Sequence, residues 1–307
     1  MYLADAHCDT LTGAMASGEG LYGFGGHLSL QKLTASFDGC IQFMAVWFRS
    51  QEGMPALAHG ALDYFDAQRR KNGDILRLIL GKDDVDADPR GRVHALLSLE
   101  GGDFLDGKLE NLGVFYYRGV RSLCLTWNGR SALGDGAGVS EPRGLTDFGK
   151  EVVRNMNALG MIADVSHASA LVFWDALEIS ASPVIASHSN AYGVCPNRRN
   201  LNDAQLRAMG EAGGFVGLNM YPPFISGGET ADEDMILRHI RHMLAAAGED
   251  CVGLGCDFDG IDATPEGYGS AADLPKLYHR LVREFGGNLT DKIFYGNLKR
   301  VVKDVLR

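Results

Sequence analysis

Six residues that can bind metals or carry protons each end a short apolar run in this 307-residue chain. They are His7, Asp9, Glu100, His167, His188 and Asp257, and the runs read LADAHCD, VHALLSLE, GMIADVSH, SPVIASH and CVGLGCD. A charged group at the exit of a buried strand is paired, metal-bound or catalytic, because burying it alone is costly. The repeated placement therefore predicts a metal centre.

Three nitrogens and two carboxylates form a ligand set that suits zinc or a similar divalent ion. His7 and Asp9 are two residues apart, so on a strand their side chains share a face. These two would hold one ion, and His167 and His188 would hold a second. Glu100 would bridge the two ions. Each ion would then keep room for water, which is typical of a catalytic site.

Asp257 is the candidate proton carrier. The mouth of a barrel would place it beside the metals, where a carboxylate takes a proton from water and returns it to a leaving group. Strand alternation puts Asp259 on the same face, so spacing alone leaves both acids open. Ser166 and Ser187 precede two of the histidines, but strand neighbours face apart. We therefore expect no serine–histidine nucleophile pair.

Eight apolar runs provide the strands that must position these residues. They span residues 2–7, 40–48, 93–100, 119–127, 160–166, 183–188, 213–220 and 251–257. Most are continuously apolar, which is typical of parallel strands buried on both faces. No composition break divides the chain, so we predict one domain over 1–307, a (β/α)8 TIM-type barrel of metallo-dependent hydrolase architecture. A doubly wound open sheet is the alternative, but it would spread the ligands along a line.

Segments with helical periodicity lie between the strands, at residues 56–71, 146–159 and 231–247. Gly160 and Gly248 are the expected ends of the last two. His239 and His242 are three residues apart within 231–247, and we expect them on a solvated helix face. Residues 128–145 form a long glycine-rich loop after the fourth strand. Long loops are usually functional, so this one is predicted to fold over the mouth as a lid.

Composition narrows the class of protein. The net charge of −10 and the absence of a basic stripe argue against nucleic-acid binding. The six cysteines form no CxxC, and most lie in apolar runs, which predicts buried free thiols in a reducing compartment. The first residues lack a secretion signal, and the longest apolar stretch is too short for a bilayer. We therefore expect a cytoplasmic protein without membrane contact.

Nearly the whole chain resembles the membrane (renal-type) dipeptidases, peptidase family M19, of the amidohydrolase superfamily. The matching blocks are DAHCD, HLSLQKLTASFDGCIQF, LSLEGG, RSLCLTW, DVSHAS, SHSNAYGVCPNRRN, LNMY, GCDFDGIDATPEG and GNLKRV. An HxD motif in the first strand, in place of HxH, distinguishes this family from most of its superfamily.

The resemblance implies a centre of two zinc ions with Glu100 as the bridging ligand. It selects Asp257 over Asp259 as the catalytic acid and base. It also adds Arg199, in the RRN block, as the anchor for the terminal carboxylate of the substrate. A planar guanidinium suits that role, because it can donate two parallel hydrogen bonds. The adjacent Arg198 is expected to face solvent.

The chain departs from the family pattern at Trp127. Renal-type members carry histidine there, in contact with the substrate carbonyl, whereas this chain reads LTWN. An indole N–H donates one hydrogen bond but cannot become cationic. Trp127 and Asn128 are therefore assigned to substrate binding, with Asn128 available to stabilise the oxyanion. Such a donor is typically worth about 3 kcal/mol, so the change should alter rate or substrate and not abolish the chemistry.

These features predict a zinc-dependent dipeptidase that acts on small peptides, including those with a D-residue at the C-terminal position. The alternative is an amidohydrolase that opens lactams, cyclic amides or esters with the same two-metal centre. A third hypothesis is a barrel that binds metal without catalysing a reaction. The resemblance also implies a homodimer.

Overall fold

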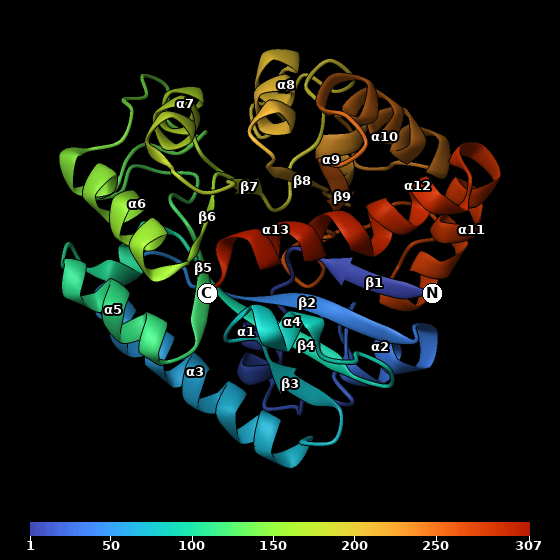
Figure 1. The fold of residues 1–307 in the computed structure, drawn as a ribbon, viewed down its shortest axis with the longest axis horizontal. Coiled ribbons are helices and arrows are strands. Elements are labelled where there is room, and N and C mark those ends of the chain that lie inside the picture. The colour runs from blue at the N-terminus through green and yellow to red at the C-terminus, as the bar shows by residue number, and fades with distance from the viewer.

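Parallel strands close into a ring surrounded by helices, and the computed structural model describes residues 1–307 (Figure 1). The ring consists of β1 Tyr2–Asp5, β2 Gly39–Val46, β4 Val93–Glu100, β5 Val120–Cys124, β6 Ile162–Asp164, β7 Ile185–Ala186, β8 Phe215–Leu218 and β9 Val252–Leu254. Each strand pairs with its neighbours in this order, and β9 pairs with β1. The predicted (β/α)8 barrel is confirmed.

One strand was not predicted. Strand β3, Leu76–Leu78, pairs with the first half of β4, whereas β5 pairs with the second half of β4. Strand β2 pairs with β4 along seven residues, so β3 adds to the ring without belonging to it. The segment has three residues and includes the exposed Arg77, so it shows no apolar run.

The helices follow the strands in sequence. They are α1 Thr10–Ser17, α2 Leu30–Ser36, α3 Met54–Lys71, α4 Lys82–Asp86, α5 Leu109–Tyr117, α6 Asp147–Leu159, α7 Ala170–Ile179, α8 Asp203–Glu211, α9 Pro222–Ile225, α10 Glu233–Ala247, α11 Leu274–Phe285, α12 Gly287–Asp291 and α13 Asn297–Val305, with shorter turns η1 Gly102–Leu105, η2 Ala271–Asp273 and η3 Lys292–Gly296. The three predicted helices are α3, α6 and α10. Thr146 and Asp232 cap α6 and α10, and Gly160 and Gly248 end them as predicted.

The C-terminal helix α13 packs against the barrel. Val301, Val302 and Val305 of α13 share a buried cluster with inward residues such as Ala4 and Phe43. Figure 1 shows α13 crossing in front of the strands. The other apolar residues form a larger core that includes the outer faces of the strands and the buried faces of the helices. The mouth at the carboxyl ends of the strands is thus left for polar side chains.

Most strands are shorter than predicted, and for four of them this changes how the site is built. Strands β1, β6, β7 and β9 end two or three residues before His7, His167, His188 and Asp257, respectively. These residues therefore lie in loops just after the strands. The backbone is left-handed at His167 (φ 66°) and at Asp257 (φ 62°), which is uncommon for residues other than glycine. Strand alternation consequently does not decide their directions.

The glycine-rich loop 128–145 is packed beside the mouth, where the Ala137 N–H donates to the carbonyl of His167 (2.7 Å), and its role as a lid stays a prediction. Leu133 and Asp135 are buried, and Asp135 accepts hydrogen bonds from the Arg130 side chain (2.8 Å) and the Arg143 backbone N–H (2.7 Å). A Cβ at Gly136 would lie 1.8 Å from the carbonyl oxygen of Trp127. The glycines thus allow the loop to fold tightly against its own beginning.

His239 is buried, so the expectation of a solvated face is wrong for this residue. Its Nδ1 accepts a hydrogen bond from the Ala191 N–H (3.2 Å), and its Nε2 donates to the Ile225 carbonyl (2.9 Å). His242, one turn later, forms an ion pair with Asp203 and is partly exposed. Helical periodicity identified α10 but not the face on which an apparently polar residue would be buried.

Replacing His239 with alanine should lower the free energy of unfolding by about 2–4 kcal/mol, because it leaves a buried N–H and a buried carbonyl unpaired. His242→Ala, in the exposed ion pair, should change it by at most about 1 kcal/mol. Burial lowers the pKa of His239 to about 4. As pH falls from about 6.5 towards 4, His239 is protonated in the unfolded state but not yet in the folded state. The free energy of unfolding of the wild-type protein should therefore decrease over this pH range. Urea unfolding of both variants between pH 4 and 8 tests this, and an equal loss for both would contradict it.

Two composition-based expectations concern the whole chain. All six cysteines are free thiols, and all are buried, whereas the sequence predicted burial only for those in apolar runs. No helix combines the length and the apolar character needed to cross a membrane.

Candidate active site

Buried acids and histidines gather at the carboxyl ends of the strands. His7 and Asp9 follow β1, Glu100 is the last residue of β4, and His167 and His188 follow β6 and β7; all five are at least 90% buried. Their ligand atoms form overlapping groups within 4.8 Å, one of His7, Asp9 and Glu100 and one of Glu100, His167 and His188. The structure thus brings all five predicted ligands together, with Glu100 in both groups.

The shortest separations centre on Glu100. Its Oε1 lies 2.8 Å from His167 Nε2 and 3.8 Å from His188 Nε2, while its Oε2 lies 3.4 Å from His7 Nε2. His7 Nε2 is also 3.4 Å from Asp9 Oδ2. One carboxylate therefore has one oxygen towards each pair of ligands, which is the arrangement that a bridging ligand requires.

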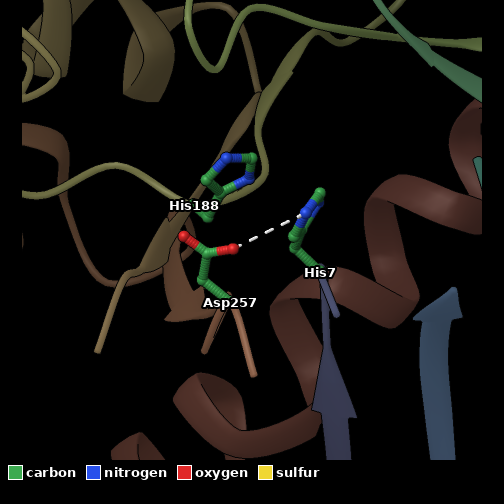
Figure 2. A group of neighbouring side chains, drawn as sticks. All are labelled: His7, His188 and Asp257. Atoms are coloured by element: carbon green, nitrogen blue, oxygen red, sulfur yellow. Dashed lines mark ion pairs between the residues drawn. The ribbon is translucent and has the colours of Figure 1, made fainter. Parts of the chain in front are cut away.

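A third group joins His7, His188 and Asp257. Figure 2 shows the Asp257 carboxylate directed towards His7, with the His188 ring beside it. Asp257 Oδ1 is 3.7 Å from His7 Nε2. The predicted proton carrier therefore lies against the same cluster, on the loop after β9.

The ring tautomers fit cations in this cluster. His167 Nδ1 lies 2.9 Å from the Asn128 side-chain oxygen, which only accepts, so Nδ1 carries the hydrogen. His188 Nδ1 lies 2.8 Å from the Ser187 hydroxyl, and that hydroxyl donates to Asp164. Both Nε2 lone pairs then point into the cluster, only 2.8 Å apart. Shared cations would remove this repulsion.

Two cluster atoms are buried without a hydrogen-bond partner, namely His7 Nε2 and Asp9 Oδ1. An orphaned buried polar atom is costly unless something satisfies it. Both residues belong to the same group of ligands, so a divalent ion bound there would give them a partner. The donor set of imidazoles and carboxylates is the one that zinc prefers.

Serine and histidine interact here in a way that the sequence did not predict. Ser187 is within hydrogen-bond distance of His188, contrary to the expectation that strand neighbours face apart, because β7 ends at Ala186. Ser187 is 1% exposed and its hydroxyl is committed to Asp164. It therefore orients a ligand and is not available as a nucleophile.

The electrostatics of the cluster are anionic. Burial raises the pKa of Asp9 to about 6 and that of Asp257 to about 7, and the Glu100 charge adds to both shifts. Burial lowers the pKa of His167 to about 4 and that of His188 well below its usual value. Although burial opposes it, the charges of Glu100 and Asp9 raise the pKa of His7 well above its usual value. The crowded carboxylates therefore favour positive charge in this site, while His167 and His188 stay neutral.

Asp257 and Asp259 have different surroundings, although both lie after β9. Asn219 donates a hydrogen bond to Asp257 Oδ2 (2.8 Å), which leaves Oδ1 facing the cluster. Asp259 accepts from the Thr10 hydroxyl and the His27 N–H, both at 2.5 Å. Asp259 thus anchors a neighbouring loop. The geometry agrees with the choice of Asp257.

Sequence reasoning missed two residues that hold Asp257 in place. Asn219 is the second residue of the LNMY block but had no assigned role; its signal was a polar residue directly after β8. Gly260 lies so close to the acids that a Cβ there would be 2.1 Å from Asp9 Oδ2 and 2.6 Å from Asp257 Oδ1. Only glycine fits at this position without moving the two carboxylates.

Arg199 is buried next to the cluster and lacks an acidic partner. Its Nε and Nη2 have no hydrogen-bond partner, and its guanidinium carbon lies 5.4 Å from the Phe224 ring centroid. The Asn200 side chain holds this loop by donating to the Phe224 carbonyl (2.8 Å). The adjacent Arg198 is exposed, as predicted, and donates to the Gly138 carbonyl. A buried, unpaired guanidinium is a ready-made site for an anion.

A cavity of about 590 Å³ connects these groups. Its lining includes Asp9, Glu100, Trp127, Asn128, His167, Arg199 and Asp257. Asn128 therefore contacts both the cavity and His167, and its side-chain oxygen is committed to the histidine. Trp127 is 37% exposed at the rim. All predicted site residues except His7 and His188, which lie deeper, line this cavity.

A closed (β/α)8 barrel with buried histidines and carboxylates at the carboxyl ends of its strands has the architecture of a metal-dependent hydrolase. The model of one family, membrane dipeptidase (peptidase family M19), matches residues 1–307. The chain belongs to this family, and it is a peptidase of the metal-dependent type.

Single proteins are also similar to this chain in sequence or in structure. An uncharacterized protein from Klebsiella pneumoniae is 38% identical over 242 residues, which cover 75% of this chain and 89% of that protein. Dipeptidase 3 of Rattus norvegicus is 31% identical over 289 residues, which cover 91% of this chain but 59% of the rat protein. A metallo peptidase from Rhodobacter sphaeroides, solved with a phosphinate mimic of L-Ala-D-Ala, superposes with a TM-score of 0.91 at 26% identity and covers 99% of both chains.

Proposed function

We propose that this chain is a zinc-dependent dipeptidase that removes the C-terminal residue of dipeptides, including a residue of D configuration. The observation that carries this proposal is Arg199, a buried cation without an acidic partner in the cavity that contains the cluster. A free carboxylate at the end of a short substrate would pair with it. The similarity to Dipeptidase 3 of Rattus norvegicus, and to a metallo peptidase that was solved with a mimic of L-Ala-D-Ala, supports the same substrate class.

Two zinc ions fit the ligands present. His7 and Asp9 would hold one, His167 and His188 the other, and Glu100 both. When bound, such ions polarise a carbonyl oxygen and supply a water that ionises near neutral pH. The unpaired atoms His7 Nε2 and Asp9 Oδ1 support this assignment.

The residues of the chain itself have separable tasks in hydrolysis. Arg199 binds the terminal carboxylate and thereby limits the length of the substrate. Asp257 accepts the proton of the attacking water at Oδ1 and delivers it to the leaving amine, while Asn219 holds its other oxygen. Asn128 keeps His167 in the tautomer that presents Nε2 to the cluster. This division of tasks follows from which atoms are free and which are committed.

The decisive experiment is a substrate panel with zinc-loaded protein. Amine release from L-L and L-D dipeptides should exceed release from tripeptides, from dipeptide amides, and from lactams or esters. Hydrolysis of lactams or esters without hydrolysis of dipeptides would instead favour the amidohydrolase alternative. Zinc binding without turnover of any of them would indicate a barrel that only binds metal.

Metal removal gives a second test. Chelator-treated protein should unfold at a lower temperature than protein with added zinc, because a ligand that binds only the folded state stabilises it by about 3 kcal/mol at a hundredfold excess over Kd. Glu100→Gln should lower the zinc content from two ions per chain, since one shared oxygen becomes an amide nitrogen. Mass spectrometry of zinc under native conditions measures this. Glu110→Gln, on the exposed face of α5, is the control and should retain both ions.

A further inference from the structure

Two cavities meet at Trp127. The main cavity of about 590 Å³ adjoins a second cavity of about 230 Å³. Four residues line both, namely Phe48, Arg49, Glu100 and Trp127. The second cavity also has the polar side chains of Asp103, Arg130, Ser50 and Ser131 in its lining, none of which lines the main cavity. The Trp127 indole thus lies between the aromatic side chains of Trp47 and Phe48 and a cavity that contains these four polar side chains.

The indole is held as a fixed wall. Its centroid lies 5.4 Å from that of Trp47, and it stacks on the His167 ring at 6.0 Å with an interplanar angle of 29°. Aromatic pairs at such distances stabilise one another beyond simple burial. Arg49 also lines both cavities, but its side chain is exposed. Trp127 is therefore the rigid part of the partition.

The order of strands in the ring gives the direction of a bound substrate. Arg199 lies on the loop after β7, whereas Trp47 to Arg49 lie on the loop after β2. In the ring these two strands are opposite each other. If Arg199 holds the C-terminal carboxylate and the scissile bond lies over the cluster, the N-terminal residue must point towards β2, β4 and β5. That is where Trp127 and the second cavity are.

Resting on the proposed dipeptidase function, we infer that Trp127 decides which N-terminal side chains the enzyme accepts. The N-terminal side chain packs on an apolar wall of Trp47, Phe48 and Trp127, and Trp127 keeps it from the polar side chains of the second cavity. Dipeptides with an aliphatic or aromatic N-terminal residue are therefore preferred. A side chain of similar size with a buried amide has no partner on this wall, and the unpaired amide disfavours it.

The test compares Leu-Ala with Gln-Ala, which differ at the N-terminal residue in polarity more than in size. Zinc-loaded wild-type protein should show a kcat/KM for Leu-Ala about tenfold above that for Gln-Ala. Trp127→Ala opens the second cavity, so this ratio should fall about tenfold. Trp127→Phe keeps an apolar ring and should retain most of the preference. Trp174→Ala removes an exposed tryptophan of α7 outside the cavity and is the matched control.

A second readout does not depend on turnover. Dissociation constants of phosphinate mimics of the two dipeptides, measured by calorimetry, should show the same change in ratio. Trp127→Leu serves if the alanine variant does not fold. The inference would be overturned if the variants, above all Trp127→His, changed kcat equally for both dipeptides and left the ratio of their kcat/KM values constant. That result would assign Trp127 to the reacting carbonyl. Failure of wild-type protein to hydrolyse any dipeptide would instead refute the proposed function.

Discussion

Asp257→Asn should lower kcat for dipeptides by about a thousandfold, within the range of 10²–10⁴ that general acid–base catalysis typically contributes. The change keeps the shape of the side chain and its contact with Asn219 but removes the oxygen that can carry a proton. The carboxylate lies among other buried acids, so its loss relieves repulsion, and the free energy of unfolding should not fall.

The zinc content of the variant distinguishes proton transfer by Asp257 from metal binding by Asp257. Asp257 also forms a group with His7 and His188 that could hold an ion. If it were an essential ligand, the variant would lose zinc together with activity. We expect full zinc occupancy and almost no turnover. Asp262→Asn is the matched control, because Asp262 is an exposed acid that lines the same cavity, and its activity should stay within about twofold of wild type.

Arg199→Met should raise KM for dipeptides about a hundredfold, which corresponds to about 3 kcal/mol for a buried charge pair with the substrate carboxylate. The effect should vanish for dipeptide amides, because they lack the carboxylate. Arg198→Met, next to it on the surface, should leave KM unchanged. Steady-state kinetics on matched acids and amides decide this, and an equal rise in KM for both would remove Arg199 from carboxylate binding.

The same variant should behave unusually in unfolding experiments. Arg199 is buried with two nitrogen atoms unpaired, so removing its charge leaves no orphaned partner. Replacing a buried unpaired charge with a side chain of similar volume is neutral or stabilising. Metal-free Arg199→Met should therefore melt at the same temperature as wild type or higher. A higher KM together with an unchanged or higher melting temperature would show that Arg199 serves substrate binding and not stability.

Much of the site was predictable because its residues lie next to strongly apolar runs. A (β/α)8 barrel brings all strand exits to one mouth, so a residue needs only to follow a buried strand to reach the site. His7, Glu100 and His188 were identified in this way, and the structure places them within one cluster. The family resemblance added Arg199 and selected Asp257 over Asp259.

Contacts between distant segments were not predictable. His239 is polar in sequence but is buried because the loop after β7 and the end of α9 both offer it hydrogen bonds. Loop 128–145 is rich in glycine, which suggests mobility, yet its glycines permit close packing. The roles of Asn219 and Gly260 depend on distances to Asp257 that only the closed barrel sets.

The sequence by itself determined the barrel and the set of ligand-type residues at its mouth, because both follow from local patterns of burial. Only the tertiary structure decided which atoms are free to act. It committed Asp259 and Ser187 to other partners, left Arg199 unpaired, and placed Trp127 between two cavities. The physical reason is that a strand exit brings a residue to the site, whereas its role depends on neighbours contributed by other strands.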